Sequence, residues 1–262
     1  MSFSTTEFCK FCNVGREALR LYEKLGLISP RINPDNQYRI YDEWDASKIA
    51  EIKHYQGLGF SLKEIAEILE NSDLAQTIES MKKSVTIYQN RIRHDQMRCK
   101  KIEEELKIIS QIPDLLDCYF YCDLPEMVYF PTPENNQDLN HPGKNNFMQH
   151  LDFLTPCLRI DRDYSGDESR QDYSGWGVLI TREYAEYLDI HDGLSLPSSK
   201  SLCTIIDAGE KGTLSRNRFE SFLSRLDQEP SSAVTTMYGA LLTRTHDMNG
   251  NYHRYLFTFA RV

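Results

Sequence analysis

The feature that most constrains this chain is an apolar stripe between residues 74 and 112. Hydrophobic residues recur there at alternating spacings of four and three: Leu74, Ile78, Met81, Val85, Tyr88, Ile92, Cys99, Ile102, Leu106 and Ile109. This period predicts a long helix with its apolar residues along one side. Because a single exposed helix cannot bury such a stripe, the pattern predicts a coiled coil with a partner, and Pro113 predicts its end.

Asp95 interrupts the stripe between Ile92 and Cys99. One interpretation is a device that fixes the register of the coiled coil, since a buried polar residue disfavours other alignments. The other, which we favour, is a residue near water that pairs with Arg91, Arg98 or an arginine of the partner.

The stripe separates two regions of different character in a chain of 262 residues. We expect three parts: a first domain at residues 1–73, a dimerisation helix at 74–112 and a second domain at 117–262. Residues 113–262 carry 22 acidic and 13 basic side chains, which accounts for a net charge of −9, the value for the whole chain. The overall acidity therefore says little about what the first domain binds, which depends on the local clustering of its charges.

Bulk properties favour a cytoplasmic protein without a membrane partner. The chain has no apolar run of about 18 residues, and its start lacks a basic segment followed by an apolar core. Its seven scattered cysteines are typical of reduced thiols rather than of a disulfide framework.

Residues 4–27 have the pattern of two short helices joined by a tight turn, which is the helix-turn-helix arrangement. The turn formers at 30–36 and the alternating "QYRIY" predict a β-hairpin wing. Asp42 and Ser61 are then positioned to cap two further helices, and Glu64 completes a capping box with Ser61.

In "REALRLYEKLG", Arg16, Arg20 and Lys24 recur every four residues, so they share one side of the second helix. Charge alone favours an ordinary solvated surface, because Glu17 and Glu23 are adjacent. The helix-turn-helix context favours DNA binding instead, since its second helix presents its exposed side to the major groove.

Three blocks, "VGREALRLYEKLGLISP", "YRIYD" and "LGFSLKEIAEIL", occur in this order. They closely resemble the winged helix-turn-helix of MerR-type transcription regulators over about seventy residues. The resemblance puts Arg20 at the family's recognition arginine, with Arg16 one turn earlier, and we assign base reading to these two. It implies further contacts with the DNA backbone or the groove edge from Tyr22, Tyr38, Arg39, Tyr41 and Lys63.

The resemblance also implies that two copies of residues 74–112 pair antiparallel in a homodimer, which would bind promoter spacer DNA. Such regulators distort the spacer when an effector binds, so that RNA polymerase can use both promoter elements. A ligand can shift this balance only by binding the distorting state more tightly.

From residue 117 the pattern changes to strands, with roughly two units of strand, helix and strand pair and a final hairpin turning at Asn249-Gly250. This arrangement resembles the GyrI-like effector-binding domain of multidrug-sensing MerR regulators. The expected fold class is therefore multidomain α+β: an α-helical winged helix-turn-helix, a long antiparallel coiled coil and a GyrI-like α/β effector domain.

Aromatic and acidic residues of this second domain suggest a site for a small lipophilic, cationic effector, because the domain is acidic and cation–π contacts favour such ligands. The candidates are Trp176, Tyr238, Tyr173, Tyr187, Phe153, Asp207 and Asp161. In close relatives the residue after the position of Tyr238 is a key glutamate, whereas here it is Gly239, so the acid must come from elsewhere.

The alternative function is a thiolate-based metal- or redox-sensing regulator, because Cys9 and Cys12 form a C-x-x-C pair. Both lie inside the expected first helix, where a packed core cysteine is the favoured interpretation. We expect no metal, no cofactor and no enzymatic activity, since the chain has no Gly-x-Ser-x-Gly, no Walker loop and no paired His/Cys motif.

Overall fold

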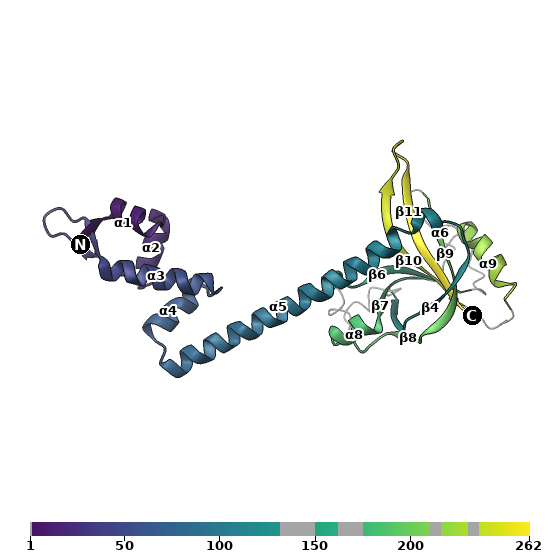
Figure 1. Ribbon diagram of the computed structural model, residues 1–262, viewed down its shortest axis with the longest axis horizontal. Coiled ribbons are helices and arrows are strands. Elements are labelled where there is room, and N and C mark those ends of the chain that lie inside the picture. The colour runs from purple at the N-terminus through teal and green to yellow at the C-terminus, as the bar shows by residue number, and fades with distance from the viewer. Residues whose placement is uncertain (1, 132–149, 162–174, 210–215, 230–235) are drawn as a thin grey trace. The chain divides into compact units, whose positions relative to one another are not determined.

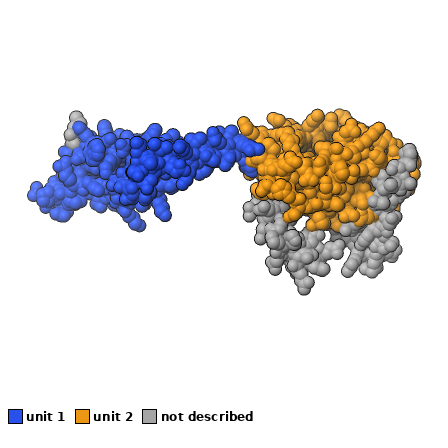
Figure 2. Space-filling model, turned by 90° about the horizontal axis from the view of Figure 1, so that it is seen from below, with its two compact units in different colours: residues 1–95 blue, residues 96–262 orange. Residues whose placement is uncertain are grey.

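The computed structural model describes residues 2–131, 150–161, 175–209, 216–229 and 236–262. The chain divides into two compact units, residues 1–95 and residues 96–262 (Figure 2). The division falls inside the long helix, so each unit includes one part of that helix.

The first unit combines four short helices with a small antiparallel sheet of strand order β1-β3-β2 (Figure 1). Its elements in chain order are β1 (Ser2–Ser4), α1 (Thr5–Cys12), α2 (Arg16–Lys24), β2 (Arg31–Ile32), β3 (Arg39–Asp42), α3 (Glu43–Gly57) and α4 (Leu62–Glu70). Helices α1 and α2 form the expected helix-turn-helix, and β2 and β3 form the expected hairpin. Strand β1 was not expected, and its pairing makes β3 the central strand.

Side-chain caps fix where three of these helices begin. Each is a capping box, in which two side chains and two backbone N–H groups bond reciprocally. The caps expected at Asp42 and Ser61 are confirmed. The three boxes are Ser4–Glu7 at α1, Asp42–Asp45 at α3 and Ser61–Glu64 at α4.

The core of the first unit lies where the helices meet the central strand. Phe8 of α1 and Tyr41 of β3 are both fully buried, and their rings stack at 4.4 Å with an interplanar angle of 10°. Leu19 of α2 and Ile49 and Ile52 of α3 complete the packing. Helix α2 is therefore held by its apolar side, which leaves its basic side exposed.

The long helix α5 spans Leu74–Ile109, and the short helix α6 (Ile112–Leu115) follows it. The expected end at Pro113 is only approximate, because Pro113 lies in the first turn of α6. None of the residues of α5 is buried within a single chain. The side chains of Leu74, Val85 and Ile92 are 77%, 56% and 57% exposed, so the apolar stripe faces outward along the first unit's part of the helix.

The second unit is built on an eight-stranded antiparallel sheet of order β4-β9-β11-β10-β6-β7-β5-β8. The strands are β4 (Phe120–Leu124), β5 (Met127–Pro131), β6 (Thr155–Asp161), β7 (Gly175–Thr181), β8 (Leu194–Leu196), β9 (Ser199–Asp207), β10 (Thr236–His246) and β11 (Tyr252–Arg261). Its described helices besides α6 and the end of α5 are α8 (Arg182–Tyr187), the 3-10 turn η2 (Arg216–Phe219) and α9 (Glu220–Leu226).

The sheet consists of two halves of the same topology that meet where β10 pairs with β6. In one half β11 lies between β9 and β10, and in the other β7 lies between β5 and β6. In each of the trios β9-β11-β10 and β5-β7-β6, the last strand along the chain is thus the middle one. The edge strands are exchanged: β4 precedes β5 in sequence but pairs with β9, and β8 precedes β9 but pairs with β5.

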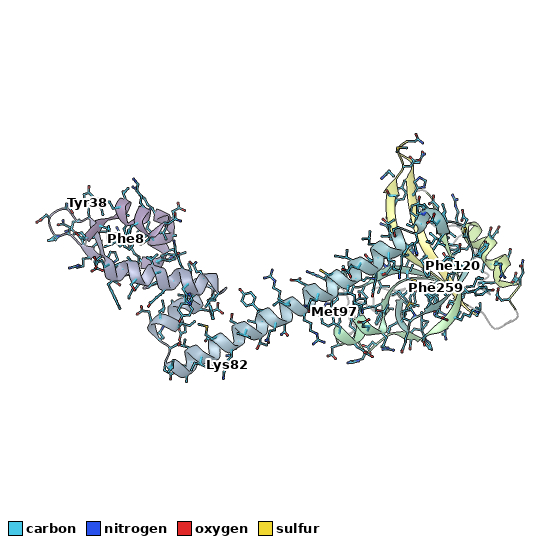
Figure 3. All side chains as sticks on the ribbon, viewed as in Figure 1. Phe8, Tyr38, Lys82, Met97, Phe120 and Phe259 are labelled. Carbon is cyan, nitrogen blue, oxygen red and sulfur yellow. The ribbon has the colours of Figure 1, made fainter. Side chains whose placement is uncertain are left out.

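The last turns of α5 pack against this sheet and helix α8. The Tyr184 hydroxyl donates a hydrogen bond to Glu104 Oε2 at 2.9 Å, and Arg98 Nε donates to Asp152 Oδ2 at 2.7 Å. Lys100 forms an ion pair with Glu183, and Met97 contacts the apolar cluster around Phe153 (Figure 3). Residues 96–109 are therefore a structural part of the second unit.

Candidate functional site

A polar cleft of about 240 Å³ in the first unit brings together residues that are distant in sequence. Helix α2 supplies Arg16, Arg20 and Glu23, and strand β3 supplies Arg39 and Tyr41. Three of the arginines predicted to contact DNA thus line one surface feature.

Glu23 connects helix α2 to strand β3 of the hairpin. Its carboxylate accepts a hydrogen bond from Arg39 Nε at 2.7 Å and one from the Tyr41 hydroxyl at 2.6 Å. The hydrogen bond to Glu23 raises the pKa of Arg39, and burial together with the same carboxylate raises the pKa of Tyr41. Sequence reasoning treated Glu23 only as a neutralising neighbour, although its position one turn after Leu19 and Arg20 put it beside the wing.

Two of the predicted DNA contacts are core residues. The ring of Tyr41 is fully buried against Phe8 and its hydroxyl donates to Glu23, so its contact with a phosphate stays a prediction that this packing does not favour. Tyr22 is only 5% exposed, and its hydroxyl donates to Gln56 Oε1 at 3.3 Å. Tyr22 was predicted to reach the DNA backbone or to pack at the groove edge, whereas in the structure its side chain packs in the core of the first unit.

The other predicted contacts are at the surface. Arg20 is exposed on α2, and exposed Arg16 donates from Nη2 to Thr6 Oγ1 at 2.8 Å. Tyr38 is 72% exposed in the loop that leads into β3 (Figure 3). Lys63 is exposed in the first turn of α4, where the helix dipole favours anions.

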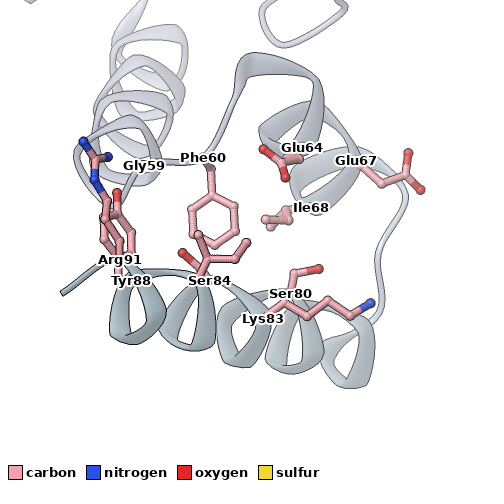
Figure 4. A pocket seen from close by; sticks show the side chains of 11 residues that line it. Gly59, Phe60, Glu64, Glu67, Ile68, Ser80, Lys83, Ser84, Tyr88 and Arg91 are labelled. Carbon is pink, nitrogen blue, oxygen red and sulfur yellow. The ribbon is translucent and has the colours of Figure 1, made fainter. Parts of the chain in front are cut away.

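A second hollow of about 310 Å³ lies in the first unit between the turn after α3, helix α4 and the first part of α5 (Figure 4). Phe60 and Ile68 form its apolar floor, while Glu64, Lys83 and Arg91 stand around it. Sequence analysis gave no indication of this hollow, because its walls come from segments whose packing is not visible in a periodic pattern.

The second unit contains an apolar cavity of about 180 Å³ between the end of α5 and one face of the sheet. Met127, Leu179, Ala240 and Phe259 line it from four different strands. Helix α5 closes the other side with Lys101, Glu105, Ile108 and Ile109. Ile109, which the heptad pattern placed in the coiled-coil stripe, therefore borders the cavity.

The charged groups of this cavity are both on α5. Lys101 Nζ lies 3.2 Å from Glu105 Oε1 and donates a hydrogen bond to Thr155 Oγ1 at 3.2 Å. The side chain of Glu105 is half-exposed, whereas that of Lys101 is mostly covered. The cavity thus combines apolar walls with one lysine–glutamate ion pair on α5.

The predicted ligand-binding aromatic residues are not gathered in this cavity. Tyr238 comes nearest: it is 4% exposed and stacks at 5.5 Å on Phe259, which lines the cavity. Trp176 packs against a different cluster, on the sheet face opposite to Leu179, because residues three apart in a strand point to opposite faces. The rings of Phe153 and Tyr187 lie with their centroids 5.9 Å apart in the cluster around Tyr184. Tyr173 lies outside the described residues.

The two predicted acids are engaged elsewhere. Asp161 accepts hydrogen bonds from Arg159 and Thr236, and Asp207 is 2.7 Å from His253 Nδ1. Burial alone would raise the pKa of Asp207, but hydrogen bonds from His253 and two backbone N–H groups lower it. A side chain at Gly239 would point toward Leu256, Phe219 and Leu158, away from the cavity.

Two absences concern only the residues whose positions the structure describes. In these residues, no group of three or more His, Cys, Asp or Glu side chains is arranged to hold a metal ion. No helix among them is both long enough and apolar enough to cross a membrane.

Residues 3–72 match the family described as MerR HTH family regulatory protein. The chain is 38% identical over 69 residues to a mercuric resistance operon regulatory protein of Bacillus cereus, which is 26% of this chain and 52% of the relative. It is 34% identical over 86 residues to a multidrug-efflux transporter 2 regulator of Bacillus subtilis, which is 32% of each chain. The chain therefore spans about half or less of the length of these curated relatives.

Among solved structures, a cryo-EM structure of an EcmrR–DNA complex covers 99% of this chain and 100% of its own. The sequence identity is 18% and the TM-score 0.36. Residues 3–72, which include the helix-turn-helix and the hairpin described above, are therefore the part of this chain that matches the MerR helix-turn-helix family.

Proposed function

We propose that this chain is a dimeric, DNA-binding transcription regulator whose second unit binds a small lipophilic effector. The observation that carries the DNA-binding part is the cleft where Arg16 and Arg20 of the recognition helix meet Arg39 of the wing. These cations stand on the exposed side of a helix whose other side is docked on the core, which is the arrangement a major-groove reader needs.

Within this surface, we assign different tasks to the exposed residues. Arg16 and Arg20 read base edges, because an arginine pairs bidentately with guanine. Arg39, Tyr38 and Lys63 contact phosphates, which position the protein without specifying the sequence. Glu23 holds Arg39 in place through the 2.7 Å hydrogen bond, so the wing and the recognition helix approach DNA as one body.

The exposed stripe of α5 supports the dimer. Leu74, Val85 and Ile92 are more than half exposed in a single chain, although burial of apolar side chains is favourable. An antiparallel partner helix is the proposed cover, and a dimer would present two recognition helices to the two halves of a site.

The effector proposal is supported by the apolar cavity and by the two-half topology of the sheet, which is the arrangement expected of a GyrI-like domain. Apolar walls with few charged groups suit a compact hydrophobic ligand. Glu105 supplies the carboxylate that the glycine at position 239 cannot, and it favours a cationic ligand.

Helix α5 gives a physical route from effector to DNA. Its last turns form one wall of the cavity, and its first turns belong to the unit that carries the recognition helix. A ligand that fits better in one position of Ile108 and Ile109 stabilises that position of α5. In this proposal, the dimer then distorts the promoter spacer and RNA polymerase begins transcription.

The decisive experiment is selection of a binding site from a random duplex library, followed by fluorescence anisotropy with the enriched duplex. Arg20→Ala should weaken binding to this duplex by about 5- to 100-fold, the range for one bidentate arginine–guanine pair. Lys107→Ala removes the same charge at an exposed position in the second unit and should change the affinity by less than about twofold. Failure to enrich any duplex would refute the DNA-binding proposal.

The metal- or redox-sensing alternative is tested on the same protein. The matched residues 3–72 are shared by relatives named for mercuric resistance and for multidrug efflux, so this segment does not discriminate between the effectors. A titration with lipophilic cations, neutral aromatic compounds and thiophilic metal ions discriminates between them. If only metal ions bind, the metal-sensing alternative is correct and the lipophilic effector is refuted.

A further inference from the structure

Two cysteines of the second unit face each other across neighbouring strands. Cys122 on β4 and Cys203 on β9 are both free thiols, and their Sγ atoms are 3.0 Å apart. Two unbonded carbon atoms lie about 3.5–4.0 Å apart at their optimal distance, and sulfur is larger than carbon. The two sulfur atoms are therefore closer than an ordinary non-bonded contact. A disulfide bond requires about 2.05 Å, so only a small further approach separates the pair from a covalent bond.

The strand register explains how the two sulfurs meet. Cys122 is opposite Ser201 and Cys203 is opposite Phe120, so the two cysteines are diagonal neighbours on the same face of the sheet. Cys203 is fully buried, whereas Cys122 is half-buried because β4 is the edge strand. Of the two residues, Cys122 is therefore the one that a small reagent would reach first.

The pair also lies near the apolar cavity, although neither cysteine lines it. Cys122 and Cys203 belong to the same apolar cluster as Met127, Leu179 and Phe259, which line that cavity. Leu124, two residues after Cys122 on β4, lines the cavity as well. A bond between the cysteines would join the edge strand covalently to β9, with which it pairs through the backbone ladder and through Lys200, whose Nζ lies over the Tyr121 ring.

We propose that Cys122 and Cys203 form a reversible disulfide when the protein meets a hydroperoxide, and that this bond fixes strand β4 beside the cavity. The bond does not depend on the function proposed above. Its effect on effector binding does rest on that function, because it assumes that the cavity is the effector site.

The chemistry balances with one peroxide. The Cys122 thiolate attacks a peroxide oxygen, the O–O bond breaks, and the released hydroxide takes a proton to become water, which leaves a sulfenic acid on Cys122. The Cys203 sulfur then attacks the Cys122 sulfur, the S–O bond breaks, and the second hydroxide leaves as water with the Cys203 proton. Two thiols lose two electrons and two protons, and hydrogen peroxide becomes two water molecules.

The order of the two steps follows from the burial of the two sulfurs. Burial raises the pKa of Cys203, which keeps its thiol protonated until Cys122 has reacted. A dithiol reductant reverses the reaction by thiol–disulfide exchange.

The experiment uses the full chain, treated with hydrogen peroxide, blocked with N-ethylmaleimide and digested with trypsin. Cleavage after Lys107, Lys144, Lys200 and Lys211 puts Cys203 in peptide 201–211 and both Cys118 and Cys122 in peptide 108–144. The Cys118→Ser variant removes this ambiguity. In that variant we expect a linked pair of these peptides in most molecules, and dithiothreitol should abolish the link.

The matched variant Cys122→Ser changes the less buried partner and should give no linked peptide. Peroxide should slow hydrogen exchange of the β4 amides several-fold in the Cys118→Ser protein and leave it unchanged in Cys122→Ser. Complete alkylation of Cys122 after peroxide, or its oxidation beyond sulfenic acid without a link to Cys203, would overturn the proposal.

The effect on the cavity has a separate readout. Crystal violet, a lipophilic cationic dye, is titrated against the reduced and the oxidised Cys118→Ser protein. We expect a several-fold difference in its dissociation constant. A linked peptide with equal dye affinity in both states would reject the coupling to the cavity, and dye binding to neither state would count against the effector site and not against the disulfide.

Discussion

The hydroxyl of Tyr41 donates a hydrogen bond of 2.6 Å to Glu23, which joins the central strand of the small sheet to the recognition helix. The same carboxylate holds Arg39. A buried tyrosine therefore determines where a surface arginine stands, and this relationship leads to the first prediction.

Tyr41→Phe removes the hydroxyl and leaves the ring stacked on Phe8. Because a hydrogen bond to a charged acceptor contributes about 1.5–3 kcal/mol, we expect the free energy of unfolding to fall by about that amount. Urea unfolding of the chain measures it. DNA affinity should fall as well, since Glu23 and Arg39 lose a support. An unchanged unfolding midpoint would show that the bond contributes nothing.

Val85→Lys tests the dimer. Val85 is 56% exposed in a single chain, so a lysine there should leave the protomer folded, while two copies would bring cations into the shared stripe. We expect sedimentation to give mainly monomers. Asn90→Lys, at an exposed position outside the stripe, is the matched control and should remain a dimer. A stable Val85→Lys dimer would place the interface elsewhere.

Glu105→Gln tests the carboxylate at the cavity. A partly exposed ion pair contributes about 1 kcal/mol or less, so the affinity for a lipophilic cation should fall by about fivefold or less. The affinity for a neutral aromatic compound of similar size should not change. Glu103→Gln, an exposed change on the same helix, provides the comparison in a fluorescence titration. Equal losses in both variants would mean that only net charge matters.

His253 predicts a dependence of stability on pH. Its hydrogen bond to Asp207 raises the pKa of His253, with a smaller effect from Asp247 at 3.7 Å, and Tyr255 stacks on its ring. Because its pKa is raised in the folded state, protonated His253 contributes to the free energy of unfolding. This contribution is complete below about pH 6.5, the ordinary value, and is lost as the pH rises through the raised value.

The companion effect operates at acid pH. The lowered pKa of Asp207 means that its contribution is present above its ordinary pKa and is lost as the pH falls through the lowered value. The test concerns the His253 contribution, which is lost as the pH rises. From pH 5 to pH 8, urea midpoints should therefore fall more steeply for the natural protein than for His253→Asn. His246→Asn, in the same hairpin, should keep the natural slope.

Gly59→Ala tests the contact between α5 and the turn after α3. Gly59 has φ of +88°, and a Cβ there would lie 1.8 Å from the Tyr88 hydroxyl oxygen. We expect a loss of about 1–3 kcal/mol in unfolding free energy from the backbone conformation and the clash together. In the double variant with Tyr88→Ala, only the backbone part should remain, and a double-mutant cycle separates the two.

Much of this fold could be predicted because its signals are local. The spacing of Leu74, Val85 and Ile92 predicted a long helix, and the structure has it at Leu74–Ile109. Capping chemistry at Asp42 and Ser61 located two helix starts correctly. In each case the relevant interaction joins residues at most a few positions apart.

The rest depends on contacts between distant segments. The burial of Tyr41 depends on the packing of β3 against Phe8 of α1, which no short-range pattern reveals. Strand β1, which pairs with the second edge of β3, has only three residues and leaves no periodic signal. An apolar stripe also does not reveal what covers it. Ile109 continues the heptad pattern, yet its surroundings are a sheet and a cavity rather than a second helix.

The exchange of β4 and β8 between the two halves of the sheet has a consequence for biosynthesis. Strand β4 leaves the ribosome early but has to wait for β9, and β9 in turn lacks its other neighbour until β11, the final strand, emerges. The half that contains β4, β9 and β10 therefore cannot be completed before β11 is made, whereas all four strands of the other half precede β9. We therefore expect that in nascent chains truncated before β11, strands β4, β9 and β10 stay sensitive to protease, and that this half of the sheet forms in a single late step.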